Sequence, residues 1–373
     1  MNIYPYKSDW AESVIERLKS EHIDHHLYME VFEELLARTA VRNDGEFIAF
    51  IGNNRIGKTT ILKRIEEMFN PKNLAERMIY LPVLRIEIDN SGDDGKFDTK
   101  AFYEQALTAL NHPIYGYTSN DPFDVHDVEI RLNRARVRNL RSSLIAAMKL
   151  LHTQIFIIDE SQHFNYINRR TSDRAAAMLD SLKSLMGQVD CNIIVAGDYE
   201  LIKVIQQSKH MVNRLSSVEY RRYDFQNDDD LIPFETILDF FSQGIKFENG
   251  VSSLRDWNQQ IWYGSQGIVG NVSEWIRDAV SHMDKSGDIK LALKHIEATC
   301  PKQWDIDLNI AAQQIGEASF RGATNPLYKL RKKTKQGALK EETVKKDKPF
   351  QTKPDRRKIG GRLDVPNSVS EVS

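Results

Sequence analysis

The chain has 373 residues, of which 41% are hydrophobic and 28% are charged, a composition ordinary for a globular protein with one or two domains. It has two cysteines, no apolar run of the roughly 18 residues that a membrane helix needs and no signal-peptide layout at its start, so we expect no disulfide framework, no membrane partner and a cytoplasmic location. The net charge of −2 hides a basic tail with 14 Lys and Arg against 4 Asp and Glu in residues 329–362, which favours an anionic partner, with a merely solvated tail as the alternative.

The first part of the chain is expected to be helical and then to enter a sheet. Residues 8–40 carry apolar residues at helical spacing. The run 46–51 is short, apolar and followed by glycine, which is typical of a buried parallel strand. A helix follows and ends near Pro71, and a second strand is expected within 78–88, where Pro82 argues against the first half.

The next part alternates between helices and strands. Helices are expected at 99–111, 126–152 and around 174–186, and strands at 154–159, 192–196 and 218–223. This alternation predicts a parallel sheet with helices on both faces. From 231 to about 320 the pattern is helical without a strand, as in a small lid. Beyond 325 the apolar residues become too sparse to form a core, so we expect disorder there.

Residues 52–59 match the phosphate-loop pattern G-x-x-x-x-G-K-[ST] between a predicted strand and a predicted helix. Glycines let successive backbone N–H groups point at a phosphate, Lys58 reaches the β- and γ-phosphates, and the Thr59 hydroxyl binds Mg²⁺. An ordinary glycine turn is the alternative. The residues expected to contact ATP are Gly52, Asn53, Asn54, Arg55, Ile56, Gly57, Lys58, Thr59 and Thr60.

Polar side chains that fit the same site follow two later strands. Asp159 and Glu160 end the strand 154–159, at the edge where open α/β sheets bind ligands. Asp159 would hold Mg²⁺ through water and Glu160 would act as the general base, with an exposed acidic loop as the alternative. Asp198 follows the next strand and is the candidate for orienting the attacking water, with an ordinary turn residue as the alternative. Asn192 is a weaker candidate for the same role.

The predicted fold is therefore an α/β P-loop NTPase, a three-layer α/β/α parallel sheet with a small helical lid and a disordered basic tail. The expected divisions are an N-terminal helical segment at 1–40, the core at 41–228, the lid at 229–322 and the tail at 323–373.

The order of these motifs resembles the AAA+ ATPases, and more narrowly TnsC and TniB, the ATPase regulators of DNA transposition, with MuB as a more distant relative. The resemblance rests on the phosphate loop with its flanks (50–60), the Ile-Ile-Asp-Glu-Ser-Gln-His run (157–163) and the polar strand end (194–198), and it covers roughly residues 20 to 290. It implies a Mg²⁺-dependent ATPase that assembles on double-stranded DNA as a ring (hexamer- or heptamer-like) or a helical filament, and that connects a target-selector protein to transposase subunits.

The resemblance also implies an arginine that reaches the γ-phosphate of a neighbouring subunit. Arg214 fits best by position, Arg221 and Arg222 are rivals, and an ordinary surface arginine is the alternative. The lid departs from the AAA+ pattern, because the stretch 267–271 lacks the arginine of a Gly-x-x-Arg run. This departure puts a lid contact to the γ-phosphate in doubt and indicates slow, regulatory hydrolysis.

Five arginines crowd one predicted helix: Arg131, Arg134, Arg136, Arg138 and Arg141. All but Arg136 would share one face of this helix and could contact the phosphate backbone of DNA without recognising the base sequence. The alternative is a face that is simply exposed to solvent. Arg169 and Arg170 form a second candidate patch. No aromatics stand ready for base stacking, which favours double-stranded DNA.

Two other readings stay open: an AAA+ replication initiator or helicase loader, and a signalling ATPase scaffold that does not bind DNA. A histidine cluster in the first helical region (His22, His25, His26) is interpreted as surface histidines rather than a metal site.

Overall fold

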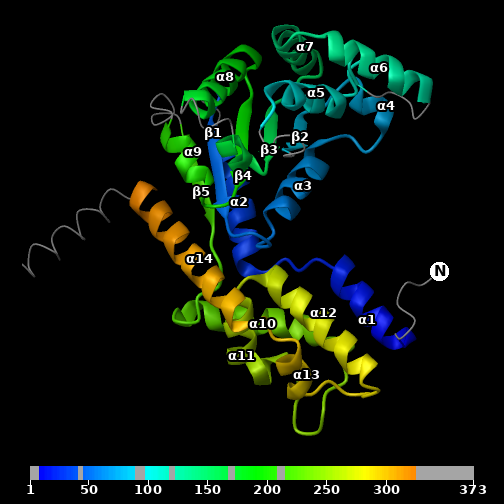
Figure 1. The fold of residues 1–373 in the computed structure, drawn as a ribbon, viewed down its shortest axis with the longest axis vertical. Coiled ribbons are helices and arrows are strands. Elements are labelled where there is room, and N and C mark those ends of the chain that lie inside the picture. Colours follow the sequence, from blue (N-terminus) through cyan, green and yellow to red (C-terminus); the bar gives the residue numbers. More distant parts are fainter. Residues whose placement is uncertain are drawn as a thin grey trace, which may run out of the picture. The chain divides into compact units, whose positions relative to one another are not determined.

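The computed structural model describes residues 8–40, 45–88, 97–116, 122–166, 173–207 and 215–324. Within them, five parallel strands form one sheet in the order β2-β3-β4-β1-β5 (Figure 1). The strands are β1 (Phe47–Gly52), β2 (Val83–Glu87), β3 (Ile155–Asp159), β4 (Asn192–Gly197) and β5 (Leu215–Tyr220). β4 lies between β1 and β3, so the carboxyl ends of the three strands that carry the predicted motifs meet at one edge of the sheet.

The helices precede, connect and follow these strands. They are α1 (Asp9–Ser20), α2 (His26–Ala40), α3 (Lys58–Phe69), α4 (Leu74–Arg77), α5 (Thr99–Ala109), α6 (Pro122–Arg134), α7 (Val137–Leu150), α8 (Asp173–Val189), α9 (Leu201–Gln207), α10 (Asp228–Ser242), α11 (Asn258–Ser265), α12 (Val269–Lys285), α13 (Leu293–Ala298) and α14 (Gln303–Thr324), with 3₁₀ turns η1 (Ser161–Tyr166) and η2 (Leu254–Trp257).

Alternate residues of the strands face two separate hydrophobic cores. On β1, Ile48 and Phe50 pack with α2, α3 and the helices that follow the sheet, whereas Phe47 and Ala49 pack with α5, α7, α8 and α9. This division follows from the period of two in a strand. It confirms the predicted three-layer α/β/α sheet.

The helices after β5 share their core with one face of the sheet. Trp275 of α12 and Phe234 of α10 belong to the same cluster as Ile48 and as α1, which packs along α12. The last described helix, α14, returns to α9, and a side chain at Gly316 would lie 2.6 Å from the ring of Tyr199, just before α9. Glycine is therefore needed where α14 passes Tyr199.

Two predicted elements differ from the structure. The helix predicted at 126–152 is two helices, because Arg136 has extended backbone angles (φ −85°, ψ 144°) between α6 and α7. β5 begins and ends three residues before the predicted strand 218–223, and the amide of Tyr223 instead donates to the carbonyl of Gly267 at 3.1 Å. α9 was not predicted.

The disordered tail was predicted to begin at residue 323, but α14 continues to Thr324. The rest of that tail, 325–373, lies outside the residues that the structure describes. Among the described residues, no helix combines the length and the apolar character needed to cross a membrane.

Candidate nucleotide-binding site

The phosphate loop joins the buried end of β1 to the first turn of α3. Gly57 has φ 111°, a left-handed conformation that glycine adopts without strain. A Cβ at Gly52 would lie 2.6 Å from the carbonyl oxygen of Tyr220 on β5, so this position also requires glycine. The loop thereby brings backbone N–H groups and the positive end of α3 to one place, as an anion site needs.

The Lys58 ammonium group is folded onto the loop. Its Nζ donates to the carbonyl oxygens of Gly52 and Asn53, both at 2.9 Å, and the residue is only 5% exposed. Burial lowers the pKa of Lys58, while the carboxylates of Glu160, Asp159 and Asp198 oppose that shift. The lysine is therefore a buried cation with only weak backbone acceptors, ready to exchange them for phosphate oxygens.

Thr59 and Asp159 meet across the site. The Thr59 hydroxyl donates to Oδ2 of Asp159 at 2.8 Å, and Asp159 is fully buried. Burial raises the pKa of Asp159, whereas the bonds from Thr59 and from the Glu160 amide lower it. A hydroxyl and a carboxylate oxygen in contact fit Mg²⁺, which takes a few protein oxygens and completes its shell with water and phosphate. The described residues contain no group of three or more His, Cys, Asp or Glu that would hold a metal by themselves.

Glu160 and Asp198 lie near Lys58, as their electrostatic effect on it requires. Glu160 has φ 55°, an uncommon left-handed conformation for a non-glycine residue at the end of a strand. Asp198 is half-buried, which raises its pKa, and its Oδ1 accepts from the amide of Glu200 at 2.8 Å.

Asn192 is at the opposite end of β4, where its Oδ1 accepts a hydrogen bond from the amide of Glu46 at 2.9 Å. The weaker water-orienting candidate was therefore wrong.

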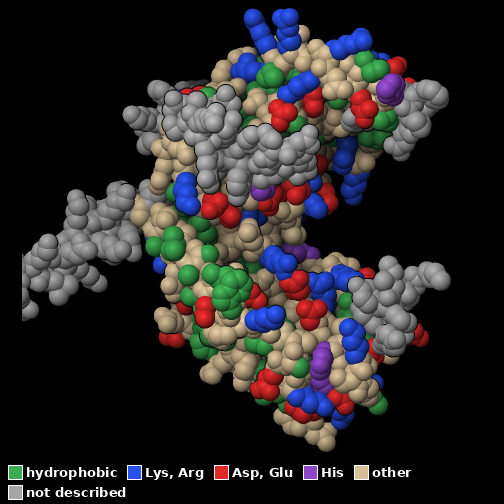
Figure 2. Space-filling model, in the orientation of Figure 1, with side chains coloured by type: hydrophobic (Ala, Val, Ile, Leu, Met, Phe, Trp, Pro, Cys, Tyr) green, Lys and Arg blue, Asp and Glu red, His purple; other side chains and the backbone are tan. Residues whose placement is uncertain are grey.

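A cavity of about 800 Å³ opens beside the phosphate loop, and Figure 2 shows the surface hollowed between the core and the helices that follow it. Residues from Leu18 to Tyr28 form one wall, and five residues of α12 form another: Val269, Gly270, Ser273, Glu274 and Arg277. Neither wall was predicted from the sequence, because both lie far from the phosphate-loop and Asp-Glu motifs along the chain. For the α12 wall, the sequence showed only that apolar residues recur at helical spacing.

α12 also touches the phosphate loop directly. Arg55, with φ 63°, forms an ion pair with Glu274. A Cβ at Gly270 would lie 2.2 Å from the carbonyl oxygen of Arg55. The lid stretch 267–271, which lacks an arginine, therefore contacts the phosphate loop through Gly270, and Glu274, one turn further along α12, pairs with Arg55 of that loop.

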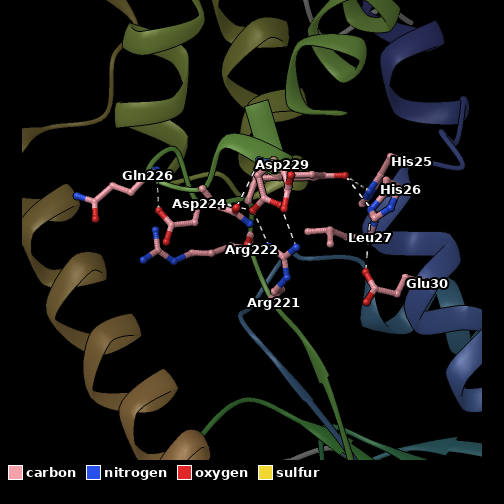
Figure 3. A network of polar contacts seen from close by, with 12 residues as sticks. His25, His26, Leu27, Glu30, Arg221, Arg222, Asp224, Gln226 and Asp229 are labelled. Atoms are coloured by element: carbon pink, nitrogen blue, oxygen red, sulfur yellow. Dashed lines mark hydrogen bonds and ion pairs between the residues drawn. The ribbon is translucent and has the colours of Figure 1, made fainter. Parts of the chain in front are cut away.

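Figure 3 shows the polar network where β5 passes into α10. Arg221 makes two bonds to Asp230, at 2.5 and 2.9 Å, and the carboxylate of Asp230 is almost fully buried. Arg222 donates to Glu317 at 2.7 Å. Both rivals for the trans-acting arginine are thus bound to acids of their own chain. Arg214 lies outside the described residues.

His25 is buried, contrary to the prediction of a surface histidine. Its Nδ1 lies 2.9 Å from the Tyr223 hydroxyl and its Nε2 lies 3.1 Å from the Tyr220 hydroxyl. Burial lowers the pKa of His25 to about 3. The ring is therefore neutral and connects α2 to the strand beside the phosphate loop, whereas His22 and His26 keep large exposed fractions.

The predicted basic face is divided by the break between α6 and α7, so its residues do not share one helical face. Arg141 donates to Ser181 and Ser184 of α8, at 3.3 and 3.1 Å, and is not free to face DNA. Arg131 lies 3.9 Å from Asp127. The exposed arginines at the elbow between the two helices are Arg134, Arg136 and Arg138, and Figure 2 shows Lys and Arg side chains gathered at this end of the core. Arg169 and Arg170 lie outside the described residues.

Comparison with known proteins gives a family match. The family model described as "Bacterial TniB protein" matches residues 15–225, more than half of the chain. The search of curated proteins returned no match.

Several solved structures are similar at 14% identity. The Aeropyrum pernix ORC2 protein in its ADPNP–ADP complexes covers 80% of this chain and 69% of that chain, with a TM-score of 0.47. The Drosophila ORC bound to DNA covers 91% and 86%, with a TM-score of 0.48. A Walker-type ATPase of Pyrococcus abyssi covers 93% and 89%, with a TM-score of 0.46. Because these TM-scores lie below 0.5, the fold assignment rests on the strand order and the family match.

Proposed function

This chain belongs to the bacterial TniB family, and from that membership and the geometry of its phosphate loop we propose that it is an ATP-dependent regulator of DNA transposition. It binds ATP and Mg²⁺, hydrolyses ATP slowly, and assembles on double-stranded DNA to connect a target-selector protein to transposase subunits. The observation that carries the proposal is the meeting of Lys58, the Thr59–Asp159 pair and Glu160 at one edge of the sheet, beside a cavity of about 800 Å³.

Each side chain has a task in this proposal. Lys58 leaves the carbonyls of Gly52 and Asn53, and its ammonium binds the β- and γ-phosphate oxygens. Thr59 and Asp159 would hold the Mg²⁺, which neutralises charge on the phosphates. Glu160 accepts a proton from the attacking water. Asp198 orients that water from the end of β4, where its position near Lys58 supports the assignment.

Neighbouring subunits are part of the proposal. The trans-acting arginine is Arg214, because the ion pairs of Arg221 and Arg222 count against those two rivals. A subunit boundary at the nucleotide would make assembly depend on ATP, since charge at the γ-phosphate is stabilised only when the neighbour is present.

The DNA surface in this proposal is smaller than the predicted face. The exposed arginines Arg134, Arg136 and Arg138 at the α6–α7 elbow support phosphate contacts without sequence readout. Arg131 and Arg141 contribute less, because they already bond to their own chain. Arg169 and Arg170 remain a second proposed DNA-binding patch.

The test is sedimentation of the protein with duplex DNA in the presence of ATP, ADP or no nucleotide, followed by electron microscopy of the same mixtures. The proposal expects ATP-dependent co-sedimentation and visible rings or filaments on DNA. A protein that assembles with ATP but ignores DNA would instead be a signalling scaffold. Discrete complexes restricted to particular DNA sequences would favour an initiator or helicase loader.

A further inference from the structure

Gln162 joins the proposed general base to the neighbouring strand. It lies in η1, directly after β3, and is only 6% exposed. Its Nε2 donates to Oε2 of Glu160 at 2.5 Å, and its Oε1 accepts from the backbone N–H of Asp198 at 3.4 Å. The side-chain amide therefore spans from a carboxylate at the end of β3 to the backbone at the end of β4.

The orientation of this amide is fixed by its two neighbours. Only the NH₂ group can face a carboxylate, and only the oxygen can face an N–H group, so a flipped amide would lose both bonds. Packing restricts the amide as well, because a Cβ at Gly197 would lie 2.4 Å from Oε1 of Gln162. The absence of a side chain at Gly197 leaves the space that the amide occupies.

We propose that Gln162 is a positioning residue for ATP hydrolysis, which aims the Glu160 carboxylate into the cavity and ties it to the strand end that carries Asp198. This inference rests on the proposed function, because it assumes that Glu160 activates water. The Glu160 side chain is 30% exposed, and its Oε2 lies 3.9 Å from the His163 ring but only 2.5 Å from the Gln162 amide. The charge-assisted hydrogen bond from Gln162 therefore directs the carboxylate.

Several charged or titratable side chains lie near Glu160: Lys58 of α3, Asp159 of β3, Asp198 after β4 and His163, whose Nε2 lies 3.9 Å from Oε2 of Glu160. Gln162 is neutral, so replacing it with an apolar residue removes the hydrogen bond and leaves the net charge of the site unchanged.

The experiment is steady-state ATP hydrolysis by the full chain, with ATP binding measured by calorimetry beside it, for wild type, Gln162→Met and Gln188→Met. Gln188 lies exposed on α8 and supplies the same substitution far from the site. We expect Gln162→Met to lower kcat roughly ten- to a hundredfold, the effect of a lost hydrogen bond to a charged group. KM, ATP affinity and the number of ATP-binding sites per chain stay unchanged. A residue with a merely structural role would lower the melting temperature and the number of ATP-binding sites together with kcat.

Two further variants keep the test decisive if Gln162→Met folds poorly. Gln162→Glu keeps the length of the side chain but replaces the donor with a carboxylate, and Gly197→Ala displaces the amide without touching Glu160. Both should lower kcat and leave ATP affinity unchanged. Wild-type kcat in these variants, or a raised kcat, would overturn the inference alone. Absence of turnover in the wild type would overturn the proposed function and the inference with it.

Discussion

Replacing Arg221 with methionine should destabilise the protein by leaving Asp230 as an unpaired buried charge. The carboxylate of Asp230 is 4% exposed and accepts two bonds from Arg221 and one from the Asp224 amide. Breaking a buried pair by removing one partner costs about 3 to 5 kcal/mol. Because the Arg221 side chain is 37% exposed and partly screened by water, we expect a smaller loss of about 2 to 3 kcal/mol.

The assay is equilibrium urea unfolding followed by circular dichroism at pH 7, with Arg138→Met on the exposed side of α7 as the matched control. Asp230→Asn combined with Arg221→Met should recover part of the loss, since no charge is then left unpaired. Burial alone would raise the pKa of Asp230, but the bonds from Arg221 and from the Asp224 amide lower it overall. The stabilisation that Asp230 gives to the folded state is therefore fully present above the ordinary carboxyl pKa, and it is lost as the pH falls through the lowered pKa of the folded protein. An Arg221→Met variant as stable as the control, yet without ATP turnover, would refute this reasoning and restore Arg221 as a trans-acting arginine.

Three more predictions concern other parts of the chain. Between pH 7 and pH 5 the wild type should lose about 2 kcal/mol more unfolding free energy than His25→Phe, because His25 binds a proton when unfolded (pKa 6.5) but not when folded (pKa about 3); equal losses in urea titrations would contradict the buried neutral ring. Gly270→Ala should weaken ATP binding measured by calorimetry, since its Cβ would meet the carbonyl of Arg55, whereas Gly187→Ala, with open space around it, should not. Arg134→Glu with Arg138→Glu should weaken DNA binding and reduce the salt slope by about two to four; an unchanged slope would remove the α6–α7 elbow from the DNA surface.

The parts of the site that were predictable from sequence are those encoded by neighbouring residues. Glycine spacing, Lys58 and Thr59 define the phosphate loop within eight positions, and an apolar strand carries Asp159 and Glu160 to its end. The parallel sheet then brings the two segments together, because β1 and β3 both flank β4. Local patterns sufficed here since the backbone geometry of each segment is set locally.

The remaining features depend on contacts between distant residues. Glu274 pairs with Arg55 across more than 200 positions, and no local pattern distinguishes it from other surface acids. The break at Arg136 has no glycine or proline to mark it, so the 3.6-residue periodicity predicted one helix. Gln162 was visible in the Asp-Glu-Ser-Gln-His run, but its bond to the backbone of Asp198 follows only from the placement of β4.

The most direct measurement of the central claim is ATP affinity and turnover in Lys58→Ala and Glu160→Gln, with wild type beside them. Lys58→Ala should lose ATP binding, because the buried ammonium that would contact the phosphates is gone. Glu160→Gln should bind ATP as the wild type does and lose turnover by a factor of about 10² to 10⁴. Unchanged affinity in the first variant together with unchanged turnover in the second would contradict a nucleotide site at this edge of the sheet.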